Sequence, residues 1–557
     1  MKDIIFINPP GLRTGPYFPV GIGYLNEILL MNKINSQILD VYNFIEVGDL
    51  NFDSSILYNI ENILKNNKSK IYAITINSAS LFWSIEIIKI IKKLYPDSKI
   101  LVGGPHITIL GEDIYKLSKN IDAALVFEGE KVIYPVVKAL LDNDFSKLKT
   151  IKNIHYLNEE GKICFNGYED INNELDKLPI INVDRTVYKN INGIAVDVGR
   201  GCSLECYFCE TNYIWNKKSR FKSVPQIAKE SQHYFDLIRN EKRAMVHYTH
   251  DNFLIDKKII RELINEKNKN SYDFNYACTT RIDFIDSETI DLLSDSSCKS
   301  IFFGIESGSS RIQNISKKQI NINKIIPKIK LICDKGIFVE SNFIIGFPEE
   351  TLSEAYDTLE LMSNIRWVNP TFSTVDFNMM SPVSKSPLGK ATQEKDFIIN
   401  ELHKGYKSLI ECNVEVDEKL LNYNRYYYMI HNENYDIKEL RNFAIFYLSM
   451  LNGYPISLYI IRNIGKVSIE NLHYHFNKAK ISTSDLRDNN LIYKFMEYLI
   501  SYYDLSVFKE YLLFENTRLN VLFGDVNNIK KIDFDSKLKE TYKKLKYNPE
   551  ILYEIIN

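Results

Sequence analysis

The chain is short of cysteine, of net charge and of unbroken apolar sequence. Only eight cysteines occur among 557 residues, and the formal net charge is −2. A chain without a basic excess lacks the electrostatic footprint of a nucleic-acid-binding protein. So few thiols in so long a chain also exclude a disulfide framework and indicate a reducing compartment. We therefore expect a cytoplasmic protein of two or three domains with no nucleic-acid partner.

Two further features are missing. The apolar run at the amino terminus is too short for a signal peptide. One uncharged stretch, residues 442–461, is long enough to span a membrane, but Asn452, Gly453 and Pro455 interrupt it. Two short buried helices joined by a turn fit such a stretch better than a single span. No membrane span is therefore predicted.

Three of the eight cysteines stand together in one C-x3-C-x2-C run, formed by Cys202, Cys206 and Cys209. A structural zinc site takes four ligands, commonly as two short pairs, and the next cysteine, Cys278, is alone. A four-iron cluster normally takes four cysteine ligands, so three leave one iron open for a substrate or cosubstrate. The spacing therefore predicts a [4Fe-4S] cluster that takes part in chemistry.

The amino-terminal residues 1–182 alternate between strand and helix patterns. Strands are predicted at residues 4–8, 36–42, 71–77, 99–103 and 123–127, with helices at 23–32 and 81–94. This alternation predicts an α/β domain with a doubly wound parallel sheet. Such sheets bind ligands beyond the carboxyl ends of their strands, where this sequence places glycines and polar residues.

Residues 183–387 repeat the alternation with six strands. They are predicted at residues 193–198, 244–249, 275–279, 300–304, 339–345 and 371–379, and most precede a helical pattern. A partial (β/α)6 barrel is expected, with functional residues at the carboxyl ends of its strands.

Residues 388–557 are expected to form a mainly helical domain. Apolar residues recur at helical spacing in residues 394–412, 418–429 and 437–452. The tyrosines at 423, 426, 427 and 428 either line a substrate cleft or, as we favour, pack on a helix face.

The cysteine loop resembles that of the radical S-adenosylmethionine (SAM) enzymes, in which the open iron holds the amino and carboxylate groups of SAM. Phe208 matches an aromatic residue that this family places near the adenine. The resemblance implies that residues at later strand ends bind the rest of SAM. These are His250 and Asp251 for the amino group, Arg281 for the carboxylate, Glu306 and Ser307 for the ribose, and Gly346 and Pro348 for the adenine.

Each of these later positions also has a plain structural interpretation. Glu306 could be a solvated acid in a loop. Arg281 could be a partner in a surface ion pair that contributes little to stability. His250 could be a hydrogen-bonded histidine at a strand end. The cysteine loop favours the SAM-binding interpretation for Glu306 and leaves the two interpretations equal for Arg281 and His250.

The amino-terminal domain resembles the cobalamin-binding domain that precedes many radical SAM cores. The matching segments are residues 8–10, 19–25, 102–106 and 128–130. The resemblance implies that cobalamin contacts Pro10, Gly103, Gly104, His106, Glu128, Gly129 and Glu130. The glycines would let the backbone approach a large flat ligand, and His106 is expected at the cofactor edge rather than on the cobalt.

One motif departs from the pattern. Many cobalamin proteins ligate cobalt with the histidine of an Asp-x-His-x-x-Gly motif, but here Tyr42 and Ile45 occupy the histidine and glycine positions after Asp40. Three alternatives stay open: cobalamin binds without a protein ligand, Tyr42 lies beneath the cobalt, or the domain is a scaffold without cofactor.

The resemblance implies a cobalamin-dependent methyltransferase that acts on an unactivated carbon through a 5′-deoxyadenosyl radical. Its cofactors would be a [4Fe-4S] cluster, SAM and cobalamin, with an external electron donor and a small-molecule or peptide substrate. One alternative is a radical SAM enzyme that catalyses ring formation, rearrangement or epimerisation without methyl transfer. Another is a non-catalytic iron–sulfur binding or sensing protein. The sequence names neither the substrate nor a catalytic residue.

Overall fold

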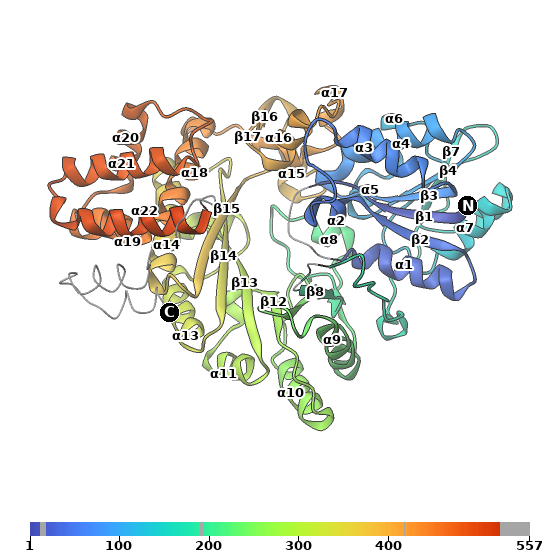
Figure 1. The fold of residues 1–557 in the computed structure, drawn as a ribbon, viewed down its shortest axis with the longest axis horizontal. Coiled ribbons are helices and arrows are strands. Elements are labelled where there is room, and N and C mark those ends of the chain that lie inside the picture. Colours follow the sequence, from blue (N-terminus) through green and yellow to red (C-terminus); the bar gives the residue numbers. More distant parts are fainter. Residues whose placement is uncertain (12–17, 190, 192, 417, 524–557) are drawn as a thin grey trace. The chain divides into compact units, whose positions relative to one another are not determined.

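The amino-terminal sheet has seven strands in the order β2-β1-β3-β4-β5-β6-β7 (Figure 1). The first five run parallel, whereas β6 and β7 are antiparallel. The computed structural model describes residues 1–11, 18–189, 191, 193–416 and 418–523. The strands are β1 (Lys2–Asn8), β2 (Ser36–Asp40), β3 (Ser69–Thr75), β4 (Lys99–Gly103), β5 (Ala123–Leu125), β6 (Ile154–Leu157) and β7 (Ile163–Phe165).

Both faces of this sheet are buried, which is why its strands read as continuous apolar runs. Along β1, Ile4 and Phe6 enter one hydrophobic core, and Ile5 and Ile7 enter the other. The first core also takes residues of α1 (Val20–Met31) and α7 (Ile133–Leu141). The second takes residues of α3 (Ile56–Lys65) and α4 (Leu81–Leu94). The predicted doubly wound sheet is confirmed.

Three strands of this sheet end earlier than predicted: β2 at Asp40 rather than residue 42, β3 at Thr75 rather than residue 77, and β5 at Leu125 rather than residue 127. Residues 36–42 were expected to be extended, but β2 ends at Asp40 and α2 (Val41–Glu46) follows. The side chain of Asp40 caps this helix by accepting a hydrogen bond from the Asn43 backbone N–H at 3.0 Å. Tyr42 therefore lies in the first turn of a helix rather than at a strand end.

Six further strands are arranged in the order β15-β14-β13-β12-β11-β8. The pairs β8–β11, β11–β12, β13–β14 and β14–β15 are parallel, and helices alternate with the strands, as the sequence predicted. Thr351 and Glu354 form a capping box that starts α14. The strands are β8 (Gly193–Val196), β11 (Met245–Tyr248), β12 (Tyr276–Thr280), β13 (Cys298–Glu306), β14 (Phe338–Ile345) and β15 (Ser373–Met379), and the main helices are α9 (Val224–Ile238), α10 (Lys258–Asn270), α13 (Ile325–Asp334) and α14 (Leu352–Val368).

The chain divides into two compact units. The first contains Met1–Thr279, Asp295–Cys298 and Ser381–Met429. The second contains Thr280–Ser294, Lys299–Met380 and the chain from Ile430 onward. The first unit therefore holds the amino-terminal sheet and the cysteine loop.

The segment after the sixth strand differs from the prediction. Residues 394–412 contain β16 (Phe397–Ile399) before α16 (Lys404–Glu411). Residues 418–429 contain the short helix α17 (Glu418–Leu421) and one 3-10 turn (Arg425–Tyr427) before β17 (Tyr428–Ile430). β16 and β17 pair with each other, consistent with the strand preference of their aromatic and β-branched residues. Tyr427 and Tyr428 are buried in the second core of the amino-terminal sheet, so these tyrosines do pack, but not on a helix face.

The described residues beyond Ile430 are mainly helical. The helices are α18 (Ile437–Gly453), α19 (Pro455–Tyr459), α20 (Ile469–Ala479), α21 (Asn489–Tyr502) and α22 (Lys509–Phe523). No single helix among the described residues is long and apolar enough to cross a membrane. One pair passes that test together, Ile437–Gly453 with Pro455–Ile464, and it is bent by 113°. The interrupted stretch thus forms two helices joined by a sharp turn.

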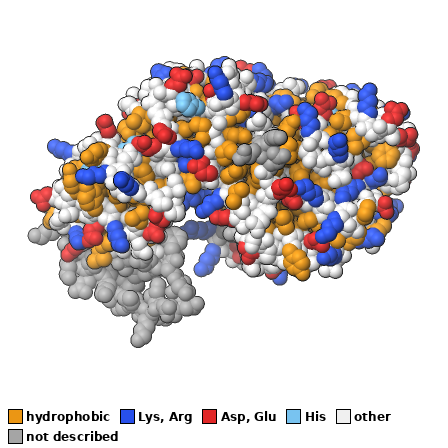
Figure 2. Space-filling view, turned by 90° about the horizontal axis from the view of Figure 1, so that it is seen from above, with side chains coloured by type: hydrophobic (Ala, Val, Ile, Leu, Met, Phe, Trp, Pro, Cys, Tyr) orange, Lys and Arg blue, Asp and Glu red, His pale blue; other side chains and the backbone are white. Residues whose placement is uncertain are grey.

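Charged side chains are mixed on the surface. On the face drawn in Figure 2, the described lysine and arginine side chains are interspersed with aspartate and glutamate rather than gathered in one patch. This distribution matches the small net charge of the sequence.

Candidate functional site

A pocket of about 740 Å³ lies at the carboxyl ends of the parallel strands of the amino-terminal sheet. Thr75, Gly103 and Leu125, the last residues of β3, β4 and β5, line it. This is where a doubly wound sheet is expected to bind a ligand. Other lining residues, including Arg200 and Trp215, come from the segments on either side of the cysteine loop. All the lining residues belong to the first unit.

The glycines of the pocket serve different purposes. Gly104 has φ +104°, and an added Cβ would lie 2.7 Å from the Ile76 carbonyl oxygen, so the chain itself requires this glycine. An added Cβ at Gly103 would make only ordinary contact, 3.6 Å from the nearest atom. At Gly21 in α1 it would meet no described atom within 4 Å. Glycine at 103 and 21 therefore leaves space in the pocket that side chains would fill.

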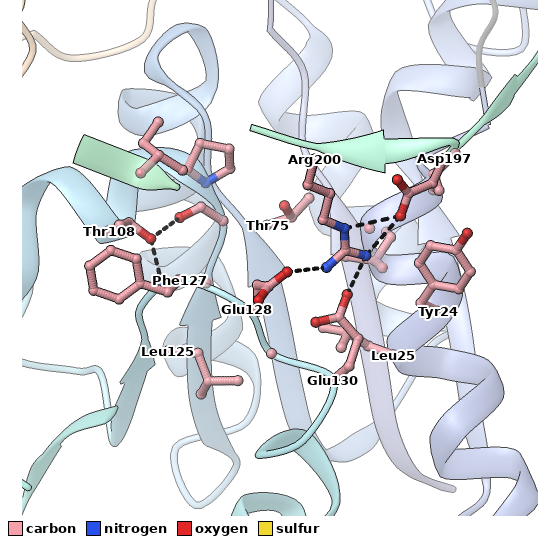
Figure 3. A pocket seen from close by; sticks show the side chains of 18 of the residues that line it. Tyr24, Leu25, Thr75, Thr108, Leu125, Phe127, Glu128, Glu130, Asp197 and Arg200 are labelled. Atoms are coloured by element: carbon pink, nitrogen blue, oxygen red, sulfur yellow. Dashed lines mark hydrogen bonds and ion pairs between the residues drawn. The ribbon is translucent and has the colours of Figure 1, made fainter. Parts of the chain in front are cut away.

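Arg200 forms the charged part of the pocket wall (Figure 3). Its Nη1 lies 2.7 Å from Glu128 Oε1, and its Nη2 lies 2.7 Å from Glu130 Oε1 and 2.9 Å from Asp197 Oδ2. These four side chains are each at most 10% exposed. A guanidinium suits three acceptors because it presents five N–H donors in a planar fork. The network joins the loop after β5 to the chain that leads into the cysteines.

A second guanidinium completes this network. Arg220 Nη2 lies 3.1 Å from Glu128 Oε1. Burial opposes ionisation of Glu128, but the guanidinium groups of Arg220 and Arg200 hold the pKa of its carboxyl below the usual range. Glu130 Oε2 is buried and has no hydrogen-bond partner among the described residues. It is therefore an acceptor that a pocket ligand could satisfy.

The three cysteines lie in a loop between β9 (Gly199–Arg200) and α8 (Thr211–Ile214), and all three are partly exposed. Gly201 has φ +88°, and a Cβ there would overlap the Lys218 carbonyl oxygen, so only glycine allows the loop to fold back on that segment. The Thr211 backbone N–H points at Cys209 Sγ, 3.4 Å away. The loop thus has a defined shape around its thiols.

Neighbouring segments of the first unit hold this loop at both ends. Burial raises the pKa of Asp251, and hydrogen bonds from the Gly201 backbone and the Thr211 hydroxyl oppose that rise. On the other side, the Leu388 backbone N–H donates to the Tyr207 carbonyl oxygen at 2.9 Å. The Lys385 backbone N–H donates to Glu210 Oε1 at 2.8 Å. Asp251 therefore contacts the residues that flank the cysteines.

The donor set fits a cluster better than a single metal ion. Among the described residues, no three histidine, cysteine, aspartate or glutamate side chains are placed to hold one ion. A cubane does not need such convergence, because each thiolate binds a different iron. Three partly exposed thiols on one short loop satisfy this requirement. Phe208 is half-buried between the second and third cysteine.

His250 follows β11 and lines the pocket. Its ring stacks on Phe221 with centroids 4.1 Å apart, and its Nδ1 accepts the Asn252 backbone N–H at 3.0 Å. Burial lowers its pKa to about 4, so the imidazole is neutral at pH 7. Because Nδ1 is an acceptor, Nε2 carries the proton, and Ser219 Oγ lies 3.4 Å from it within the protein.

Three residues predicted to contact cobalamin do not line the pocket. Pro10 is buried after β1, and Tyr42 is half-buried in α2. His106 is buried, with its Nε2 2.9 Å from the Tyr423 carbonyl oxygen and its Nδ1 3.1 Å from Ser78 Oγ. Both ring nitrogens of His106 are thus used within the protein. By contrast, Gly103, Gly104, Glu128, Gly129 and Glu130 all line the pocket.

The remaining predicted SAM residues lie in the second unit. Glu306 ends β13 with φ +71°, at a register shift in the pairing with β14. Its Oε1 lies 2.8 Å from Lys318 Nζ, and both side chains are nearly buried. No motif in the sequence pointed to Lys318. Glu306 is therefore an ion-paired residue in a conformation uncommon for glutamate, not a solvated loop acid.

Arg281 and Ser307 also bond to residues of the second unit, and Arg281 Nη2 donates to the Lys318 carbonyl oxygen at 2.5 Å. The Arg281 Nε and Nη2 donate to the two carboxylate oxygens of Asp283 at 2.9 and 2.8 Å. Ser307 turns toward α14, with its Oγ 3.2 Å from the Thr358 hydroxyl. Gly346, with φ +94°, and the half-buried Pro348 follow β14 directly.

The central part of the chain matches a known family. The Radical SAM superfamily matches residues 196–362. The chain is 26% identical over 359 residues to an uncharacterized methyltransferase from Pyrococcus horikoshii, covering 63% of this chain and 74% of that protein.

Two solved structures are similar in fold. The cobalamin-dependent S-adenosylmethionine radical enzyme OxsB, with aqua-cobalamin and S-adenosylmethionine bound, has a TM-score of 0.62 at 15% identity, covering 98% of this chain and 84% of that one. The radical S-adenosylmethionine methyltransferase TsrM from Kitasatospora setae, with cobalamin and a [4Fe-4S] cluster bound, has a TM-score of 0.62 at 13% identity. The match covers 90% of this chain and 100% of that one.

Proposed function

We propose that the protein is a cobalamin-dependent radical SAM enzyme that methylates an unactivated carbon atom, on the premise that residues 196–362 match the Radical SAM superfamily. The observation that carries the proposal is the position of the pocket. It lies at the strand ends of the amino-terminal sheet, and Arg200, two residues before the first cysteine, forms part of its wall. A ligand on that sheet would therefore sit beside the cluster loop. The methyltransferase relative supports the reaction type.

The cluster and SAM would supply the radical that removes a hydrogen atom from the substrate, and cobalamin would supply the methyl group. An external electron donor and a small-molecule or peptide substrate are part of the proposal. Cys202, Cys206 and Cys209 would ligate the cluster, and Asp251 would hold the loop that carries them. For SAM we retain Glu306, Gly346 and Pro348 of the second unit.

In the pocket, the backbone of Gly103 and Gly129 would approach the corrin, and Glu130 Oε2 would accept a hydrogen bond from one of its carboxamide groups. Among the described residues, His250, from the core, is the only histidine that lines the pocket. Because Tyr42 and His106 do not line it, we propose that no side chain of the amino-terminal sheet ligates cobalt.

The test is performed without oxygen on reconstituted protein incubated with hydroxocobalamin, a reductant and SAM that carries a deuterated methyl group. We expect corrin absorbance to stay with the protein through gel filtration and the labelled methyl group to appear on the bound cobalamin. Failure to retain corrin would contradict the cobalamin assignment.

A substitution in the pocket sharpens this test. Gly21→Phe would place a ring in the pocket without a clash at its Cβ, and we expect it to lower corrin retention about tenfold, as a steric block of a preformed pocket should. Leu30→Phe is the matched control, because Leu30 lies on the same helix, is 44% exposed and does not line the pocket. Equal corrin retention by both variants would show that the ligand binds elsewhere.

A further inference from the structure

The loop that follows β14, residues 346–350, is held by a short segment that precedes α18. We call residues 346–350 the β14 loop and residues 432–435 the clamp. Both lie in the second unit, although more than eighty residues separate them in the sequence. The clamp leads directly into the buried helix α18, whose amino terminus is capped by Asp436. The loop is thus joined to the carboxyl-terminal helices by polar contacts.

Amide groups of the clamp satisfy the loop backbone. Asn432 Nδ2 donates to the carbonyl oxygens of Phe347 and Glu350 at 2.9 and 3.0 Å, and it is buried. Asn434 Nδ2 donates to the same Glu350 oxygen at 3.1 Å. These bonds fix the loop at two points, because a buried carbonyl that loses its donor is costly to the fold.

The side chain of Glu350 links the other ends of the two segments. Its Oε2 accepts the Gly346 backbone N–H and the Tyr435 hydroxyl, both at 2.8 Å. Glu350 is fully buried, and its Oε1 has no hydrogen-bond partner among the described residues. Burial raises its pKa to about 7. Such a residue has no surface role, and its contacts instead define the start of the loop.

Packing adds to the polar contacts at Gly346. This residue has φ +94°, and an added Cβ would lie 2.8 Å from Ile437 Cδ1, at the start of α18. The backbone at Gly346 thus lies directly against the carboxyl-terminal helices. The shape of the β14 loop depends on residues that follow the barrel strands, not only on β14 itself.

We propose that the clamp holds the β14 loop in the shape that receives the adenine of SAM, so that the carboxyl-terminal helical region forms part of the SAM site. Asn432 and Tyr435 are positioning residues in this scheme, since they act through Gly346, Phe347 and Glu350. The inference rests on the proposed function, in which Gly346 and Pro348 contact SAM. It assigns to the carboxyl-terminal region a role in cofactor binding that is separate from recognition of the substrate.

Two isosteric variants test the proposal. Asn432→Asp replaces the donating amide by an acceptor that faces two carbonyl oxygens, and Tyr435→Phe removes only the hydroxyl. Asn463→Asp and Tyr474→Phe are matched controls, because both side chains are exposed on helices of the same unit. Iron content and cluster absorbance are measured first, and we expect them unchanged because the cysteine loop lies in the first unit.

SAM binding is then measured by equilibrium dialysis on the reconstituted protein, together with the KM and kcat for deoxyadenosine formation. We expect the dissociation constant for SAM to rise about tenfold in Asn432→Asp and a fewfold in Tyr435→Phe, as loss of one or two hydrogen bonds predicts. KM for SAM should rise more than kcat falls. If both variants bind SAM like the controls, the clamp has no such role. If the wild-type protein itself does not bind SAM, the proposed function fails together with this inference.

Discussion

Replacing Arg200 by lysine should disrupt the pocket wall without changing its charge. The guanidinium reaches three carboxylates at once, with Nη1 on Glu128, Nη2 on Glu130, and Nε and Nη2 on Asp197. A lysine ammonium is a single nitrogen and cannot span the same three acceptors. At least one nearly buried carboxylate would therefore lose its cationic partner.

The cost follows from that loss. A hydrogen bond to a charged group contributes about 1.5–3 kcal/mol, and a buried charge left without its partner costs about 3–5 kcal/mol. Because lysine retains part of the pairing, we expect Arg200→Lys to lower the free energy of unfolding by about 2–3 kcal/mol. The network already carries one excess negative charge, from three carboxylates and the guanidiniums of Arg200 and Arg220, so rearrangement cannot neutralise the carboxylate that is released.

Thermal unfolding of the cluster-free protein measures this change, with Arg239→Lys as the control. Arg239 also pairs with two carboxylates, those of Asp236 and Asp273, but it is 43% exposed. Exposed ion pairs contribute little to stability because solvent screens them, so the control should melt close to the wild type. Arg200→Lys should melt several degrees lower and retain less corrin. If the two variants melt at the same temperature, the buried network does not stabilise the pocket wall and the reasoning is refuted.

Two other predictions concern the fold and its pH dependence. Gly104→Ala should destabilise the protein by about 1–3 kcal/mol, because Gly104 has a positive φ and an added Cβ would clash with Ile76. Gly103→Ala should melt like the wild type but retain less corrin. Equal melting temperatures of the two variants in thermal unfolding would contradict this prediction. Burial raises the pKa of Glu515 from 4.5 to about 7, so the folded state holds the proton more tightly and stability is lost as pH rises through 7. From pH 5 to pH 8 the wild type should lose about 2–3 kcal/mol more than Glu515→Gln in urea unfolding of the cluster-free protein, and parallel pH profiles would disprove the assignment.

The sequence predicts the architecture well where the pattern is local. Parallel strands buried on both faces appear as apolar runs, so β1, β3 and β4 lie where expected. The secondary structure of the segment after β15 was harder to predict, because the apolar spacing of residues 394–412 also fits a single helix. Burial of Tyr427 and Tyr428 against the amino-terminal sheet decides their conformation, and that contact is distant in sequence.

For the candidate site too, local sequence patterns could be predicted and contacts between distant segments could not. The cysteine spacing carries its own chemistry and could be found without a structure. The sequence could not reveal Arg200, Lys318 or the clamp, because the role of each depends on contacts with residues distant in the sequence. Conversely, His106 and Tyr42 occupy suggestive positions in the sequence, but the structure places them away from the pocket lining.

The most direct test of the central claim is deoxyadenosine formation by the anaerobically reconstituted protein with SAM and a strong reductant. We predict that the wild-type protein contains about four iron atoms per chain and produces 5′-deoxyadenosine. Cys206→Ala should hold little iron and produce none. Deoxyadenosine formation by Cys206→Ala, or its absence from iron-loaded wild-type protein, would contradict the account.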